Sequence, residues 1–113
     1  MARKNTLTGT PPYAVEQALQ RLGANLRTAR LRRNLTIKDI AEKIGTGRRA
    51  VMDAEKGKGS ASAAVYIALL WACDLLDQMN DLADPAFDEE GLSLSLAKDP
   101  ARARTKKGLD NDF

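Results

Sequence analysis

The chain has 113 residues, of which 43% are hydrophobic and 29% are charged, and its formal net charge is +3. A chain of this length supports one hydrophobic core, which excludes a large multidomain enzyme. It has no histidine and one cysteine, Cys73, so a Cys/His zinc site, a histidine general base and an intrachain disulfide are also excluded. No apolar run approaches the roughly 20 residues of a membrane span. We therefore expect a cytoplasmic protein that is not an enzyme and has no cofactor.

The charges are unevenly distributed along the chain. Residues 1–60 have 13 Lys and Arg against 5 Asp and Glu, a balance of +8, whereas residues 61–100 have 1 against 8, a balance of −7. Residues 101–113 have 4 Lys and Arg against 2 Asp and Glu, a balance of +2. Such a division is typical of a protein with one face for a polyanion and another for a different partner, although chance clustering on a solvated surface is the alternative.

A long amphipathic helix is predicted after Pro12, because apolar side chains recur at intervals of three and four residues up to Ala29. Thr36 and Asp39 have the spacing of a capping box that opens a second helix over residues 37–44. Gly45 is expected to end that helix.

A tight turn and a third helix are predicted next, running through Ala50 to Glu55. Ser62 is expected to cap a fourth helix. Apolar residues from Leu75 to Leu82 predict a fifth helix that Asp84 and Pro85 terminate.

The segment from Gly91 to Leu96 alternates strictly between apolar and polar residues, which predicts one β-strand. A lone strand leaves its backbone groups unpaired, so we expect it to pair with the same segment of a second copy and to form the dimer through Leu92, Leu94 and Leu96. An extended surface arm is the alternative.

These observations divide the chain into four parts. We predict a flexible N-terminal arm over residues 1–12, a helical domain over 13–87, a dimerisation strand over 88–98 and a flexible basic tail over 99–113.

The segment from Leu35 to Lys58 resembles the helix-turn-helix of the Xre and lambda-repressor-like family. It has the Leu-Thr-x3-Ile-Ala start, the Gly45 turn and the Glu-x-Gly end of the third helix that the family shows. Physically, Ala41 is small where two helices must cross, and Val51 is placed to pack beneath the second helix. The resemblance implies an all-α, five-helix, lambda-repressor-like domain, here with one short C-terminal β-strand pairing across a dimer.

The sequences that flank the helix-turn-helix resemble one particular group within this family. The basic stretch at 21–33, the Ala-Val-Tyr-Ile-Ala-Leu-Leu-Trp helix, the Leu-Ala-Asp-Pro-Ala segment and the late alternating segment are similar to HipB-type antitoxins, the partners of HipA-type serine/threonine kinase toxins. The resemblance implies that the late strand pairs between subunits and that the C-terminal tail, with Phe113, reaches the toxin.

The family pattern also implies which residues contact double-stranded operator DNA. The groove-facing positions of the recognition helix would be Gly47, Arg48, Arg49, Met52 and Asp53. Arg48 and Arg49 are the strongest candidates, because a guanidinium can bond O6 and N7 of guanine together. Contact with phosphate only is the alternative for these arginines, packing for Met52, and an ion pair with Arg49 for Asp53.

Further residues are implied to hold the DNA backbone or the fold. Thr36, Lys38, Lys56 and Lys58 would contact phosphates, whereas Arg30 and Glu55 align with a structural ion pair between helices. Two departures from the family pattern are Gly47, where a capping Ser or Thr is usual, and Ile37, where a Gln often holds phosphate.

The function that these expectations favour is a homodimeric, sequence-specific repressor with a near-palindromic operator, acting as the antitoxin that controls its own operon and binds a HipA-like kinase. The alternatives are a stand-alone or phage-type repressor, and an interaction module that no longer binds DNA. The adjacent carboxylates at 88–90 are expected to be solvated rather than to hold a metal.

Overall fold

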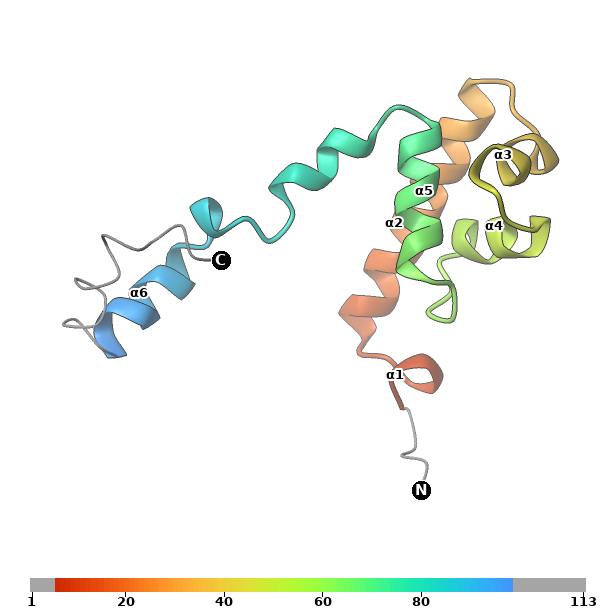
Figure 1. Cartoon of the computed structure of the whole chain (residues 1–113). Helices are drawn as coiled ribbons and strands as arrows, with labels where there is room; N and C mark the ends of the chain where they lie inside the picture. The colour runs from red at the N-terminus through yellow and green to blue at the C-terminus, as the bar shows by residue number, and fades with distance from the viewer. Residues whose placement is uncertain (1–5, 99–113) are drawn as a thin grey trace. The chain divides into compact units, whose positions relative to one another are not determined.

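The computed structural model describes residues 6–98, and all the regular secondary structure in this range is helical (Figure 1). The chain separates into two compact units, Met1–Asp77 and Gln78–Phe113. None of the helices described combines the length and the apolar character needed to cross a membrane. In chain order the helices are α1 (Thr6–Gly9), α2 (Tyr13–Arg32), α3 (Ile37–Ile44), α4 (Arg48–Glu55), α5 (Ala63–Ala72), the 3-10 helices η1 (Leu76–Asp81) and η2 (Pro85–Phe87), and α6 (Glu89–Lys98).

Three predicted helix boundaries are confirmed by their hydrogen bonds. Thr36 Oγ1 accepts from the Asp39 N–H at 3.0 Å, and the Asp39 carboxylate accepts from the Thr36 N–H at 3.1 Å, which completes the capping box of α3. The Thr36 N–H, and after it the Thr36 side chain, stabilise the Asp39 carboxylate and hold the pKa of Asp39 below its usual range. Gly45 ends α3 with φ +81°, and the Ser62 hydroxyl accepts from the Val65 N–H at 3.2 Å where α5 begins.

The core lies where α2, α3, α4 and α5 meet, and α2 and α5 run side by side (Figure 1). Aliphatic side chains make up most of it, together with Tyr66 and Cys73. On α4, Val51 and Ala54 are fully buried, and on α3 Ile40 and Ala41 are 1% and 2% exposed. The small Ala41 thus allows α3 and α4 to pack closely, which fixes the angle between the two helices of the motif.

Two glycines bring α2 into direct backbone contact with the end of α4. A Cβ on Gly23 of α2 would lie 2.7 Å from the Glu55 carbonyl oxygen and 2.8 Å from the Gly57 nitrogen. Gly57 has φ +71°, and a Cβ there would lie 2.5 Å from Cα of Gln20. Only glycine fits at either position, so this contact sets the place of the loop after α4.

Replacing Gly23 by alanine is therefore expected to lower the free energy of unfolding by about 1–3 kcal/mol through overpacking, although alanine is the better helix former. Gly9→Ala is the matched control, because nothing lies within 4 Å of that position, and it should change the free energy by less than about 0.5 kcal/mol. Urea denaturation of the two variants measures the difference. Equal midpoints would show that α2 can move away from α4 at little cost.

The predicted strand at Gly91–Leu96 is wrong, because these residues lie in helix α6. The Asp88 carboxylate accepts from the Gly91 N–H at 2.9 Å, Glu89 and Glu90 lie in the first turn, and Lys98 lies in the last turn. These local interactions stabilise a helix without a partner, whereas a strand would need a second strand that residues 6–98 do not supply. Period-two alternation over six residues does not by itself decide between the two structures.

The helix also changes what the leucines can do together. Residues two apart in a helix point about 200° apart, so Leu94 lies opposite Leu92 and Leu96. All three are exposed, by 60% (Leu92), 63% (Leu94) and 46% (Leu96). A single strand face formed by the three leucines is therefore not present.

Two further elements differ from expectation. The predicted fifth helix is the short 3-10 helix η1, which follows Asp74 with its left-handed φ of 60°. Within the predicted N-terminal arm, Thr6–Gly9 forms α1, and the Thr10 N–H and hydroxyl both bond to the Thr6 carbonyl. In the C-terminal unit, η2 packs against α6.

Candidate nucleic-acid interface

Helix α4 has one buried and one exposed face. Val51 and Ala54 lie against the core, while Arg48, Arg49 and Met52 are exposed, Met52 by 38%. The exposed residues occupy positions i, i+1 and i+4, which share one side of a helix. The structure thus brings the side chains predicted to face the groove together on the solvent side of α4.

The N-terminus of α4 has the weak cap that the sequence predicts. Gly47 is the N-cap residue and provides no side-chain hydrogen bond to the first turn. Among the described residues, no side chain accepts a hydrogen bond from the first backbone N–H groups of α4, which lie beside two arginines. A helix N-terminus in this state favours a phosphate oxygen as its hydrogen-bond acceptor.

Arg30 and Glu55 form a buried, bidentate ion pair between α2 and α4. Arg30 Nε lies 2.6 Å from Glu55 Oε2 and Arg30 Nη2 lies 3.0 Å from Oε1, with the side chains only 7% and 6% exposed. Arg30 Nη1 also donates to the Leu35 carbonyl at 2.8 Å. The hydrogen bonds to Glu55 raise the pKa of Arg30. The pair joins α2 to the end of α4, and Arg30 also holds the loop before α3, so these buried side chains fix the position of α4.

Asp53 lies between two cations. Its Oδ1 atom is 3.5 Å from Arg49 Nε, one turn back along α4, and 3.3 Å from Lys58 Nζ in the following loop. The side chain is 23% exposed, and Oδ1 itself is buried without a hydrogen bond. Of the two alternatives for this residue, the structure has the ion pair with Arg49.

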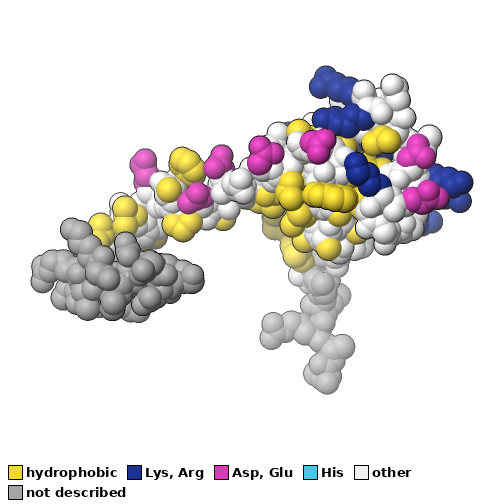
Figure 2. Space-filling view, turned by 45° about the horizontal axis from the view of Figure 1, so that its top comes forward, with side chains coloured by type: hydrophobic (Ala, Val, Ile, Leu, Met, Phe, Trp, Pro, Cys, Tyr) yellow, Lys and Arg dark blue, Asp and Glu magenta, His cyan; other side chains and the backbone are white. Residues whose placement is uncertain are grey.

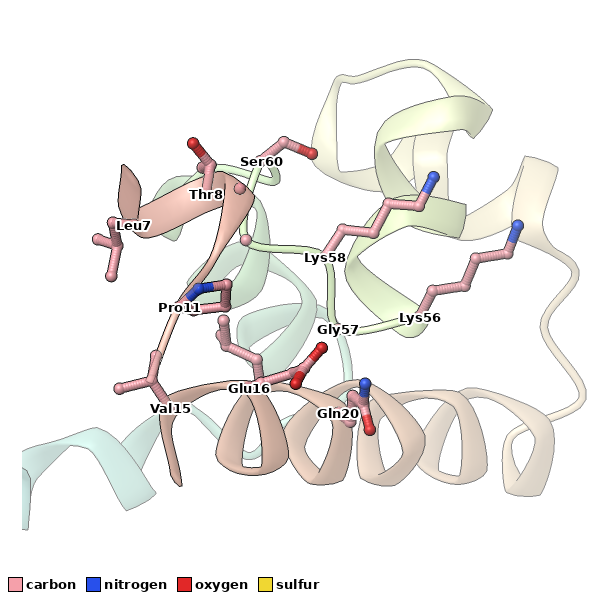
Figure 3. A pocket seen from close by; sticks show the side chains of 13 residues that line it. Leu7, Thr8, Pro11, Val15, Glu16, Gln20, Lys56, Gly57, Lys58 and Ser60 are labelled. Atoms are coloured by element: carbon pink, nitrogen blue, oxygen red, sulfur yellow. The ribbon is translucent and has the colours of Figure 1, made fainter. Parts of the chain in front are cut away.

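The residues predicted to contact phosphates lie at the two ends of the motif. Thr36 and Lys38 are exposed at the start of α3, and Lys56 and Lys58 are exposed after α4. Figure 3 shows Lys56 and Lys58 extending from the loop on one side of a cavity of about 380 Å³, with their ammonium groups pointing away from Pro11 and Val15.

Two contacts that support the interface were not predicted. The Tyr66 hydroxyl of α5 donates to the Lys58 carbonyl at 2.9 Å and so anchors the loop, and burial raises the pKa of this tyrosine. Lys43 of α3 donates to the Ala72 carbonyl at 3.2 Å and lies 5.8 Å from the ring of Trp71. Tyr66 was the available signal, because the hydroxyl of a tyrosine requires a partner when the ring is buried.

Other residues named from the sequence have no part in this surface. Phe113 lies outside the described residues. Cys73 is fully buried, and burial raises the pKa of its thiol. Among residues 6–98 no group of carboxylate and cysteine side chains is arranged to hold a metal ion.

Comparison with known proteins agrees with this geometry. Residues 21–82, more than half of the chain, match the family described as a helix-turn-helix domain. The chain belongs to this family, as a helix-turn-helix domain of the Xre and lambda-repressor type. No curated protein and no solved structure matches the chain significantly. The fold and the family together support sequence-specific DNA binding and a part in transcription regulation.

Proposed function

We propose that the protein is a sequence-specific repressor that binds duplex DNA with the exposed face of α4. The observation that carries this proposal is the arrangement of Arg48, Arg49 and Met52 on one face of a helix whose other face is fixed in the core. Guanidinium groups on such a helix can reach guanine in the major groove, with Lys38, Lys56 and Lys58 on the phosphates. No catalytic step is part of this proposal.

The proposed repressor is a homodimer in the bacterial cytosol. One helix-turn-helix contacts one half-site, and two of them about 34 Å apart would match a near-palindromic operator. Exposed apolar side chains are available for subunit contact, including Leu92, Leu94 and Leu96 of α6.

We infer further that this repressor is the antitoxin of a HipA-like kinase toxin. Support comes from the resemblance of the flanking sequences and from residues 78–98, the described part of the C-terminal unit. Acidic and hydrophobic side chains gather there, in contrast to the lysines and arginines of the helix-turn-helix (Figure 2). Phe87 there is 70% exposed and Leu82 is 67% exposed. Co-purification of the full chain with a kinase encoded beside it would support this role, and a lone gene with no kinase beside it would favour a stand-alone repressor.

The DNA-binding proposal predicts a steep salt dependence. With three phosphate-contacting lysines in each protomer of a dimer, the logarithm of the affinity should fall with the logarithm of the salt concentration at a slope of about −5. Gel shifts of the full chain with a duplex selected from a randomised pool, repeated over a range of salt concentrations, measure this slope. If no duplex is enriched and no salt dependence is found, the chain is an interaction module that has kept the fold without the DNA binding.

A further inference from the structure

The contacts of Asp53 indicate a further role for this residue. That role rests on the proposed function of α4 as the recognition helix. Lys58 contacts both the backbone and the carboxylate of this residue. The Lys58 N–H donates to the Asp53 carbonyl at 3.0 Å, and Lys58 Nζ lies 3.3 Å from Oδ1. The Tyr66 hydroxyl fixes the Lys58 carbonyl at 2.9 Å.

Arg49 is the exposed member of this group. Its side chain is 82% exposed, and its only ion pair among the described residues is the one with Asp53. That pair engages Nε. Because the guanidinium is planar, a carboxylate placed beside Nε leaves Nη1 and Nη2 for the two acceptors of one guanine.

We propose that Asp53 is a positioning residue for DNA recognition: it orients the guanidinium of Arg49 toward a base and couples it to Lys58, which holds the phosphate backbone. A long side chain that is ordered before binding loses less conformational entropy on binding. Asp53 therefore increases discrimination between sequences, while its negative charge weakens binding to all duplexes.

This role predicts that loss of the Asp53 charge raises the affinity for a random duplex and lowers the preference for the selected duplex. In Asp53→Asn, affinity for a random duplex should rise and the salt slope should steepen by up to about 1 per protomer, because Lys58 loses its internal partner. The ratio of affinities for the selected and random duplexes should fall by about 2- to 10-fold per half-site. A merely structural role would instead lower both affinities together.

The control is Glu42→Gln, which removes one negative charge from an exposed position of α3 that has no ion pair with a described residue. It should raise affinity for both duplexes and leave their ratio unchanged. Asp53→Glu keeps the charge within reach of both cations and should restore the wild-type ratio. Far-UV circular dichroism establishes that each variant is folded.

A double-mutant cycle gives the decisive result. If Asp53 acts through Arg49, the variant that combines Asp53→Asn with Arg49→Ala should lose no more discrimination than Arg49→Ala alone. Additive losses, or an unchanged ratio in Asp53→Asn, would overturn the inference and leave the proposed function standing. If the wild-type chain itself enriches no duplex, the proposed function fails and this inference fails with it.

Discussion

Replacing Glu55 by alanine is expected to lower the free energy of unfolding by about 3–5 kcal/mol, because Arg30 would keep a buried charge without its partner. The pair is bidentate, and both side chains are more than nine-tenths buried. The free energy of unfolding of a small domain is only about 5–15 kcal/mol, so this single change removes a large part of it. Urea denaturation followed by circular dichroism measures the loss.

The matched control for this variant is Glu42→Ala, which removes the same side chain from an exposed position and should cost less than about 0.5 kcal/mol. Replacing both Arg30 and Glu55 by methionine leaves no buried charge and should cost less than Glu55→Ala alone. If Glu55→Ala is as stable as Glu42→Ala, solvent reaches the pair and the ion pair does not fix α4 on α2.

Alanine at Arg48 or Arg49 is expected to reduce the preference for the selected duplex over a random duplex by about 5- to 150-fold for each half-site, since a bidentate arginine–guanine contact contributes about 1–3 kcal/mol. Both arginines are exposed on the side of α4 away from the core, so their removal should leave the fold intact. Gel shifts with both duplexes at one salt concentration measure the preference.

Lys56→Ala is the comparison for these two arginine variants, because Lys56 is exposed and has no ion pair with a described residue. A phosphate contact carries no base information, so this change should weaken binding to both duplexes about equally. Losses of the same kind in all three variants would mean that Arg48 and Arg49 hold only phosphates and that the specificity lies elsewhere.

The sequence predicts the helix-turn-helix well because its signals are local. The capping box at Thr36, the left-handed Gly45 and the cap at Ser62 are each decided by residues within one helical turn. The Arg30–Glu55 pair joins residues 25 apart, and only the family resemblance indicated it beforehand.

What the sequence did not predict depends on contacts between distant residues or on competing local signals. The close approach of Gly23 and Gly57, and the bond from Tyr66 to Lys58, require the folded arrangement of α2, α4 and α5. In α6 the alternation of leucine and serine favoured a strand, whereas the Asp88 cap favours a helix and prevails in a unit that has no second strand among its described residues.

The central claim, that DNA is bound through α4 and its flanking loops, is tested most directly by titrating the 15N-labelled full chain with the selected duplex and following its amide resonances. We expect the largest shifts at the start of α3, in α4 and its N-cap from Gly47 to Asp53, and at Lys56 and Lys58. Shifts confined to the exposed side of α5, around Ile67 and Trp71, or to α6, would contradict it.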